Sequence, residues 1–389
     1  MHIDCIQTDE ALQGLSKEWN RLLNNSRCGN IFITWEWMSS WLEFFKEDAK
    51  LYVIAVRDEK YQLIGIAPLK IAQFSFHGFS YRQLEFIGSG NGVNADYLDF
   101  IIESGKEEEV IKEILAYIWT NREEWDVINL MNFFEESYLF KIIPKMVSEN
   151  GWKCRMEAGL SCPYITLCNS WDAFQKTIKG KMKYEMRRRL KLLEANHKVE
   201  FIKLKERDEL VRGLNIFFSL HESRWEKRGT KGIFESHEKV REFHESLAFK
   251  FYEKDWLRLF FVKMDGIPVA SLYGFEYGGK FFHYNAGFDD QWAKYGIAKQ
   301  LIAFVIEDCI KLGLREFDFL KGAELYKYEW TSQERRLVRL LLWNNTMKSR
   351  LHRASYAGYH RIKEGFRSKF PSAFDSLKSI KRVITGAVK

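Results

Sequence analysis

The fold of this chain is decided by one segment, FFHYNAGFDDQWAKYGIAKQLIAFVIEDCIKLGLREFDFLKGAELYKYEW, which runs from Phe281 to Trp330. Its pattern of apolar residues predicts a β-strand, a polar turn with glycine, a long helix, a second strand and a loop rich in Lys, Glu and Tyr. The turn Tyr295-Gly296-Ile297-Ala298 leads from strand to helix. Free backbone N–H groups and the positive end of the helix dipole therefore meet at one point. This arrangement is typical of phosphate-binding sites and makes the chain a candidate enzyme.

The length and composition indicate a globular protein of two domains. The chain has 389 residues, of which 46% are hydrophobic and 29% are charged, and this length exceeds what one hydrophobic core usually serves. No apolar run is long enough to predict a transmembrane helix, and the N-terminal residues 1–9 lack the pattern of a signal peptide. The six cysteines show no metal-ligand spacing, which predicts reduced thiols in a cytoplasmic protein without a bound metal.

The positive charge of the chain is concentrated at its C-terminal end. The formal net charge is +7, and residues 347–389 hold eleven Lys and Arg against two acidic residues. The rest of the chain is therefore close to neutral. Such a segment is either a solvated basic surface or a contact for an anionic partner, which would be a membrane surface or RNA.

The two halves of the chain share one order of elements. Leu51–Arg57 and Tyr61–Ala72 are apolar runs joined by a turn, and Leu257–Met264 and Ile267–Tyr277 repeat this arrangement. A further strand, a helix and a strand follow in both halves. We therefore predict an α/β protein with two copies of one unit, at 1–160 and 161–346, and a basic helical tail at 347–389.

The order helix, three-strand meander, glycine turn, helix and strand resembles the GNAT (Gcn5-related N-acetyltransferase) fold, and tandem copies resemble its FemAB-like branch. More specifically, Trp292, Tyr295-Gly296, the segment EFDFLKG at 316–322, Tyr326-Lys327 and Trp330 resemble the CelD/BcsL group of acetyltransferases, which are associated with cellulose and exopolysaccharide biosynthesis. Three further segments agree with this resemblance: GIAPL at 65–69, HESRW at 221–225 and the basic helix at 181–191. The resemblance implies tandem GNAT-like domains with mixed, mostly antiparallel sheets, and acetyl-CoA or another acyl-CoA as co-substrate.

One feature departs from the family pattern. The GNAT pyrophosphate loop usually reads Arg/Gln-x-x-Gly-x-Gly/Ala, and Ala293 stands where the Arg or Gln would be, although Gly296 and Ala298 match. The resemblance implies that the donor is bound by Asn285, Tyr295, Gly296, Ile297, Ala298 and Lys299. The first half has no such turn, because its glycine-rich segment 88–92 leads into a strand. We interpret that half as a degenerate copy that shapes the acceptor site.

Two candidate catalytic residues lie on predicted strands of the second half. Strict alternation would place His283 and Asn285 on one face of their strand and Tyr284 and Ala286 on the other. His283 has the ordinary pKa of a general base near neutrality, or is a hydrogen-bonded strand histidine. Asp318 is either a base or acceptor anchor, or the partner of a lysine such as Lys321.

The loop after that strand carries three more candidates, Glu324, Tyr326 and Lys327. We expect Lys327 to position an anionic or carbonyl group and Tyr326 to donate a proton to the leaving thiolate. The candidate substrate-binding residues are His221, Arg224, Trp225, Arg187 and Tyr284. A Trp beside an Arg can stack on a sugar ring or can be a core aromatic. The basic helix face with Arg187 is either a solvated surface or a phosphate contact.

These residues support three hypotheses. In the first, the protein moves an acyl group from acyl-CoA to a carbohydrate or to a cell-envelope or exopolysaccharide precursor. In the second, the donor is an aminoacyl-tRNA, as in FemAB-like transferases. In the third, the chain is a non-catalytic subunit of a polysaccharide synthase complex. The basic tail would then contact the complex, or hold the protein peripherally at the inner membrane surface.

Overall fold

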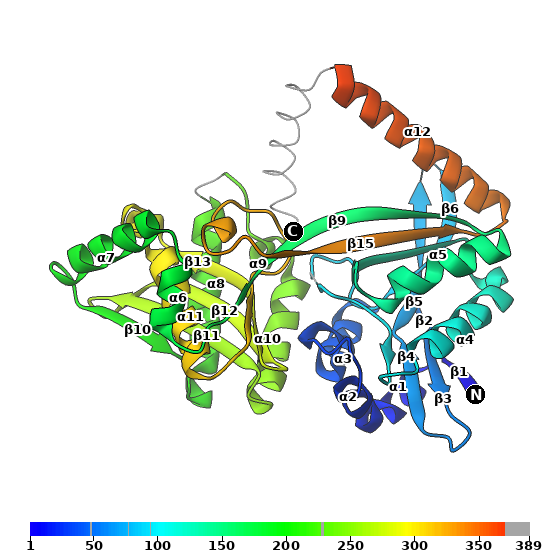
Figure 1. Ribbon diagram of the computed structural model, residues 1–389, viewed down its shortest axis with the longest axis horizontal. Coiled ribbons are helices and arrows are strands. Elements are labelled where there is room, and N and C mark those ends of the chain that lie inside the picture. The colour runs from blue at the N-terminus through cyan, green and yellow to red at the C-terminus, as the bar shows by residue number, and fades with distance from the viewer. Residues whose placement is uncertain (47–48, 77, 94, 227–228, 370–389) are drawn as a thin grey trace. The chain divides into compact units, whose positions relative to one another are not determined.

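The computed structural model describes residues 1–46, 49–76, 78–93, 95–226 and 229–369. Its internal contacts divide the chain into two compact units (Figure 1). Unit 1 consists of residues 1–159 together with 336–369, and unit 2 consists of residues 160–335. The sequence predicted a second domain at 161–346. Residues 336–346 instead belong to unit 1, because residues 337–343 pair with residues 127–134 of that unit.

Unit 1 contains two groups of strands covered by helices. Its elements are β1 (His2–Ile6), α1 (Asp9–Gly14), α2 (Ser16–Asn24), α3 (Trp35–Phe45), β2 (Ala49–Leu51), β3 (Val53–Arg57), β4 (Leu63–Ala67), β5 (Leu69–Phe76), β6 (Phe79–Phe86), β7 (Ile101–Ile102), α4 (Glu107–Thr120), β8 (Val127–Phe134), α5 (Tyr138–Asn150), the first part of β9 (Lys153–Thr166), most of β15 (Glu334–Trp343) and α12 (Met347–Lys369). Strands β1-β3-β4-β7 form an antiparallel sheet, and β15-β8-β6-β5-β2 lie side by side with only the β6–β8 pair parallel. The second apolar run of the predicted hairpin is split into β4 and β5 at Pro68, which has no N–H to donate to a sheet ladder.

Unit 2 contains one mostly antiparallel sheet between two layers of helices. Its elements are the end of β9, α6 (Trp171–Thr177), α7 (Gly180–Glu194), β10 (Val199–Lys203), α8 (Leu210–Glu226), α9 (Ile233–Ser236), α10 (Glu238–Glu253), β11 (Leu257–Met264), β12 (Ile267–Tyr277), β13 (Lys280–Phe288), η4 (Asp290–Tyr295), α11 (Ile297–Lys311), β14 (Glu316–Asp318) and η5 (Lys327–Glu329). The strand order is β10-β11-β12-β13-β14-β9, and β13 and β14 are parallel.

The two faces of this sheet are distinguished by alternate residues of β12. Leu272 belongs to the hydrophobic core that includes Ile297 and Leu301 of α11. Tyr273 instead stacks on Phe217 of α8, with ring centroids 5.1 Å apart. Successive strand residues point to opposite faces. Helix α11 therefore covers one face of the sheet and α8 covers the other.

Strand β13 separates from β14 and has a bulge against β12. It pairs with β14 only through Lys280–Phe282, so the two parallel strands part after three residues. A bulge against β12 falls at Tyr284, because His283 opposes Gly274 while Asn285 opposes Tyr273. A bulge shifts the alternation of side chains by one residue. The expectation that His283 and Ala286 face opposite sides is therefore wrong, and both line one pocket.

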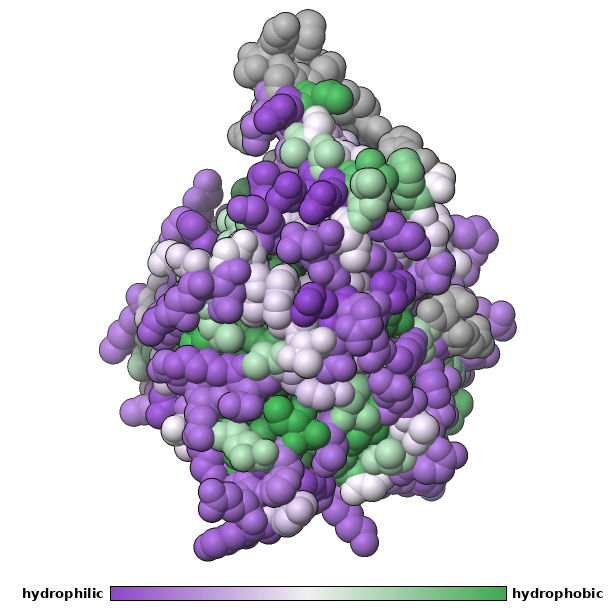
Figure 2. All heavy atoms as spheres, turned by 90° about the vertical axis from the view of Figure 1, so that its right-hand side faces the viewer, coloured by the Kyte–Doolittle hydropathy of each residue, from purple (hydrophilic) through white to green (hydrophobic). Residues whose placement is uncertain are grey.

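The chain returns to unit 1 through β15 and ends the described region with α12. His352, Tyr356 and His360 form the inner face of this helix: Trp343 Nε1 donates to His352 Nδ1 at 2.9 Å, and Tyr356 donates to Glu157 at 2.6 Å. Figure 2 shows hydrophobic side chains among hydrophilic ones in the upper part of the face on which α12 lies. The predicted tail is thus helical over 347–369, and its remaining residues lie outside the described region. None of the helices in the described ranges combines the length and the apolar character that crossing a bilayer would need.

Candidate active site

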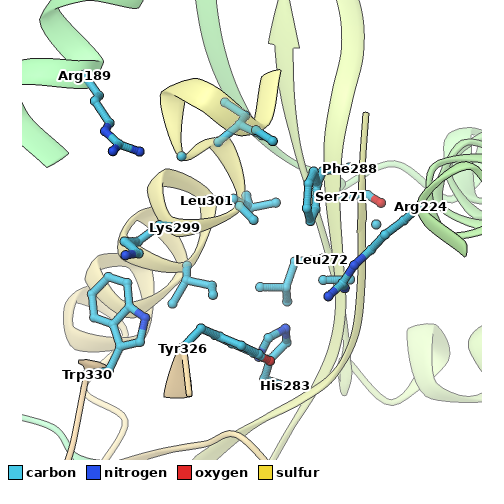
Figure 3. Close-up of a pocket in the computed structure, with 17 residues that line it drawn as sticks. Arg189, Arg224, Ser271, Leu272, His283, Phe288, Lys299, Leu301, Tyr326 and Trp330 are labelled. Atoms are coloured by element: carbon cyan, nitrogen blue, oxygen red, sulfur yellow. The ribbon is translucent and has the colours of Figure 1, made fainter. Parts of the chain in front are cut away.

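The predicted phosphate turn is present at the start of α11. The short helix η4 ends at Gly296, whose φ of 67° lies in the left-handed region that glycine adopts without strain. The N–H groups of Lys299 and Gln300 already bond to the Gly296 carbonyl. Residues 296–299, which form the first turn of the helix, line a pocket of about 330 Å³ (Figure 3). The N–H groups of Ile297 and Ala298, which precede Lys299 and Gln300 in the first turn, have no acceptor within their own helix.

A guanidinium from another helix lies at this turn. A Cβ atom placed on Gly296 would stand 3.2 Å from Nη1 of Arg189, which comes from α7. Figure 3 shows Arg189 reaching from α7 towards the start of α11. Arg189 also lies 3.4 Å through Nε from Glu185, and Lys299 pairs with Glu329. The positive side chain that the loop lacks at Ala293 is thus provided by α7.

Arg189 is absent from the residues predicted from the sequence, although its position on α7 provides a signal. Met182, Met186 and Leu193 mark the apolar side of α7, and residue 189 falls between them at helical spacing. A charged residue on such a face needs a partner or a function. The arginine that was predicted, Arg187, is exposed and donates to Gln175 at 2.7 Å. Its neighbour Arg188 pairs with Glu185 at 2.9 Å. Neither residue lines the pocket.

His283 lies in the wall of the same pocket and is 5% exposed. Its Nδ1 atom has no hydrogen-bond partner among the described residues. Burial lowers the pKa of His283 to about 3, and the charges of Lys327 and Arg224 add to this effect. The imidazole is therefore neutral near pH 7, and the prediction of a base that titrates near neutrality does not hold. A neutral ring can still hydrogen-bond to a substrate.

Tyr326 also lines the pocket. His283 and Tyr326 both contact Phe319, with ring centroids 5.8 Å and 6.3 Å from it, and Figure 3 shows them on the same side of the cavity. Burial and the carboxylate of Glu324 raise the pKa of Tyr326, and Arg224 opposes this shift. The phenol is therefore protonated at neutral pH and can donate a hydrogen bond. Trp330 also lines the pocket, and its indole Nε1 is likewise buried without a hydrogen-bond partner in the described part of the chain.

The other three catalytic candidates do not line this pocket. Asp318 is fully buried; it accepts from Leu320 N at 2.7 Å and lies 3.1 Å from Arg335. Lys327 donates to the carbonyl oxygens of Leu320 and Lys321 at 3.1 and 3.0 Å, and lies 2.9 Å from Glu324. These contacts fasten the chain after β14. Asp318, Glu324 and Lys327 thus stabilise the local structure, and their catalytic roles stay predictions.

The candidate substrate-binding residues separate into two groups. Arg224 lines the pocket, and its guanidinium lies 5.2 Å from the ring centroid of Phe288. His221 is buried behind the strand; its Nε2 accepts from Trp225 at 3.1 Å, and burial lowers its pKa despite the nearby carboxylate of Glu222. Tyr284 contacts His244 on the α8 side of the sheet. Neither His221, Trp225 nor Tyr284 lines the pocket.

The donor-binding candidates lie around the turn, with one exception. Gly296, Ile297, Ala298 and Lys299 line the main pocket, and Tyr295 lines an adjoining pocket of about 250 Å³ beside Lys179 and Lys181. Asn285 lines neither, and its side chain accepts from Ala286 N at 2.9 Å. Over the described ranges, no three His, Cys, Asp or Glu side chains are placed to hold a metal ion.

Comparisons with known proteins agree with this geometry. Residues 180–328 match the family model described as acetyltransferase (GNAT) domain. Among solved structures, FemX is similar with a TM-score of 0.59 and 11% identity, covering 89% of this chain and 98% of its own. The C-terminal domain of a putative lysylphosphatidylglycerol synthetase from Agrobacterium fabrum is similar with a TM-score of 0.52 and 9% identity, covering 91% and 96%. The L-PGS structure from Bacillus licheniformis has a TM-score of 0.50 and 14% identity, covering 85% and 92%.

No curated protein sequence matches the chain. At these identities the structural matches establish the fold, which both units share with FemX. The family match covers the turn at Gly296, the strand with His283 and the loop with Tyr326. Residues 180–328 therefore form an acetyltransferase (GNAT) domain, and the protein is a transferase.

Proposed function

We propose that this protein transfers an acyl group from acyl-CoA, and that the pyrophosphate of the donor binds at the start of α11. The observation that carries the proposal is that Gly296, Arg189 and Lys299 line one pocket, with Arg189 next to Gly296. A helix N-terminus favours an anion, and a guanidinium can bind two phosphate oxygens at once. Arg189 of α7 thereby takes the place of the loop arginine or glutamine in the family pattern.

The interior of the pocket suits the reacting end of such a donor. Leu272, Leu301 and Phe288 give it apolar walls, while His283 and Tyr326 supply polar groups. In acyl transfer, the acceptor oxygen or nitrogen bonds to the thioester carbon and the carbon–sulfur bond breaks. The protonated phenol of Tyr326 can give its proton to the leaving thiolate, while the acceptor loses its own proton to solvent and the phenolate regains one from solvent. The neutral ring of His283 can accept a hydrogen bond from the acceptor through Nδ1.

We further propose a carbohydrate or cell-envelope precursor as the acceptor. This proposal rests on the resemblance of residues 292–330 to the CelD/BcsL group, and on Arg224 beside Phe288 in the pocket wall. A cation and an aromatic ring that face one cavity suit a polar ring such as a sugar.

The competing donor is an aminoacyl-tRNA. The observation that favours it is the fold shared with FemX over nearly the full length of both chains. This alternative predicts that transfer RNA, rather than CoA, binds to the cluster of Arg189 and Lys299 and is displaced by salt.

Isothermal titration of the full chain with acetyl-CoA tests the donor. We expect saturable binding that is weakened when Arg189 is replaced by Ala and is unchanged in the Arg187→Ala variant. Absence of heat at millimolar acetyl-CoA, together with salt-sensitive binding of tRNA, would replace the proposal by its alternative. Release of free thiol from acetyl-CoA, measured with and without amino sugars, then tests the acceptor.

A further inference from the structure

Helix α12 has two faces of different character. Its inner face, with His352, Tyr356 and His360, is held against unit 1 by the contacts described above. On the opposite side, Met347, Leu351, Ala354 and Ile362 follow one another at spacings of four, three and eight residues. We call these four residues the outer stripe. All four are exposed, and Met347 and Ile362 are 73% and 74% exposed.

Exposed cations of α12 lie on either side of the outer stripe. At 100° per residue, Arg350 and Arg361 project along one flank of the stripe and Lys348 along the other, whereas Arg353 projects nearer to the inner face. All four are exposed, and residues 347–363 contain no acidic residue. The helix therefore presents an apolar strip bordered by positive charge to the surroundings.

We infer that α12 is a docking surface for an anionic membrane. A helix that lies on a bilayer buries a strip of apolar side chains at the headgroup boundary, while flanking Lys and Arg meet anionic lipids. The charge complementarity selects this partner: a protein groove would fit the apolar strip, but would gain nothing from three flanking cations. A nucleic acid would use the cations, but would leave Leu351 and Ile362 in water. This surface belongs to unit 1 and does not depend on which donor unit 2 uses.

Sedimentation of the full chain with vesicles tests the inference. We expect binding to vesicles of phosphatidylcholine with phosphatidylglycerol, and none to phosphatidylcholine alone. The double variant Lys348→Gln/Arg350→Gln should lose about fivefold in affinity per cation removed. Leu351→Glu/Ile362→Glu should abolish binding. Val211→Glu on α8 and Arg187→Gln on α7, which alter an exposed apolar residue and an exposed cation elsewhere, should bind like the wild type.

Thermal unfolding and titration with acetyl-CoA serve as controls on these variants. The outer stripe faces away from the contacts of α12 with unit 1, so neither measurement should change. Equal vesicle binding by all variants would overturn the inference. So would absence of binding to anionic vesicles, or binding of the wild type to RNA but not to vesicles at the same salt concentration.

Discussion

Arg189 and Gly296 meet at the start of α11, with Nη1 of the arginine 3.2 Å from the position that a Cβ on the glycine would occupy. The two residues are far apart in the sequence, and they make different contributions to an anion-binding site. The glycine gives the backbone turn, and the arginine gives the charge.

Replacing Arg189 by Ala should therefore weaken acyl-CoA binding. A hydrogen bond to a charged group contributes about 1.5–3 kcal/mol, which corresponds to at least a tenfold increase in Kd. Titration calorimetry measures the effect, and Arg187→Ala on the exposed side of the same helix is the matched control. Equal affinities of the two variants would remove Arg189 from the site.

Replacing Tyr326 by Phe should slow acyl transfer without weakening donor binding. The raised pKa keeps the phenol protonated, and loss of a positioned proton donor typically reduces the rate by about 10²–10⁴-fold. Thiol release from acetyl-CoA gives the rate, and calorimetry gives the affinity. Tyr328→Phe is the control, because Tyr328 lies outside the pocket and donates to Glu334. A Tyr326→Phe variant with an unchanged rate would assign proton donation to another group.

His283 should make the protein less stable in mild acid. Its pKa is about 3 in the folded protein against an ordinary value of 6.5, so between these values the unfolded chain binds a proton that the folded chain does not. This contribution to stability is complete above pH 6.5 and is lost as the pH falls towards 3, with a slope approaching about 1.4 kcal/mol per pH unit. His244, also lowered to about 3 by burial, adds a second contribution of the same sign.

The measurement is urea unfolding of the wild type and of His283→Gln from pH 7 to pH 5. We expect the variant to show a shallower decline of the unfolding free energy. Ser271→Ala, which also alters a buried side chain of the pocket wall, should leave the decline parallel to that of the wild type. Parallel curves for His283→Gln would mean that the histidine is not excluded from protonation in the folded state.

Arg335→Ala should destabilise unit 2 by about 3–5 kcal/mol, because it removes one partner of a buried ion pair. Arg335 lies 3.1 Å from Asp318 and also pairs with Glu316. Burial opposes ionisation of Glu316, but the hydrogen bond and charge of Arg335 outweigh it and lower its pKa. Denaturant unfolding measures the loss. The donor affinity at low temperature should be unchanged, whereas a large loss of affinity with normal stability would support a role of Asp318 in the active site.

The sequence was sufficient for those parts of the site that depend on local structure. The turn at Gly296, the following helix and the strand with His283 were predicted because glycine and hydrophobic periodicity act over a few residues. The tertiary features were not accessible in this way. Periodicity identifies the apolar side of α7 but not the helix that it contacts, so Arg189 was missed. The bulge at Tyr284 depends on register with β12, and the pKa of His283 depends on burial by segments distant in sequence.

Lys327 illustrates the same limit. Its position after a strand suggested a functional loop lysine, yet its ammonium group binds two backbone carbonyl groups. Whether a loop side chain turns towards the pocket or back towards its own backbone is decided by the packing around it. The residues next to Lys327 in the sequence therefore do not predict the direction of its side chain.

The division of the chain into units has a consequence for synthesis on the ribosome. Strand β8, which ends at Phe134, pairs with β15, which ends at Trp343. Unit 2 is an uninterrupted stretch between them, so it is fully translated before the last strand of unit 1 emerges. Domains generally fold as units during translation. Unit 2 can therefore fold first, while β8 of unit 1 stays without its partner strand until β15 has been synthesised.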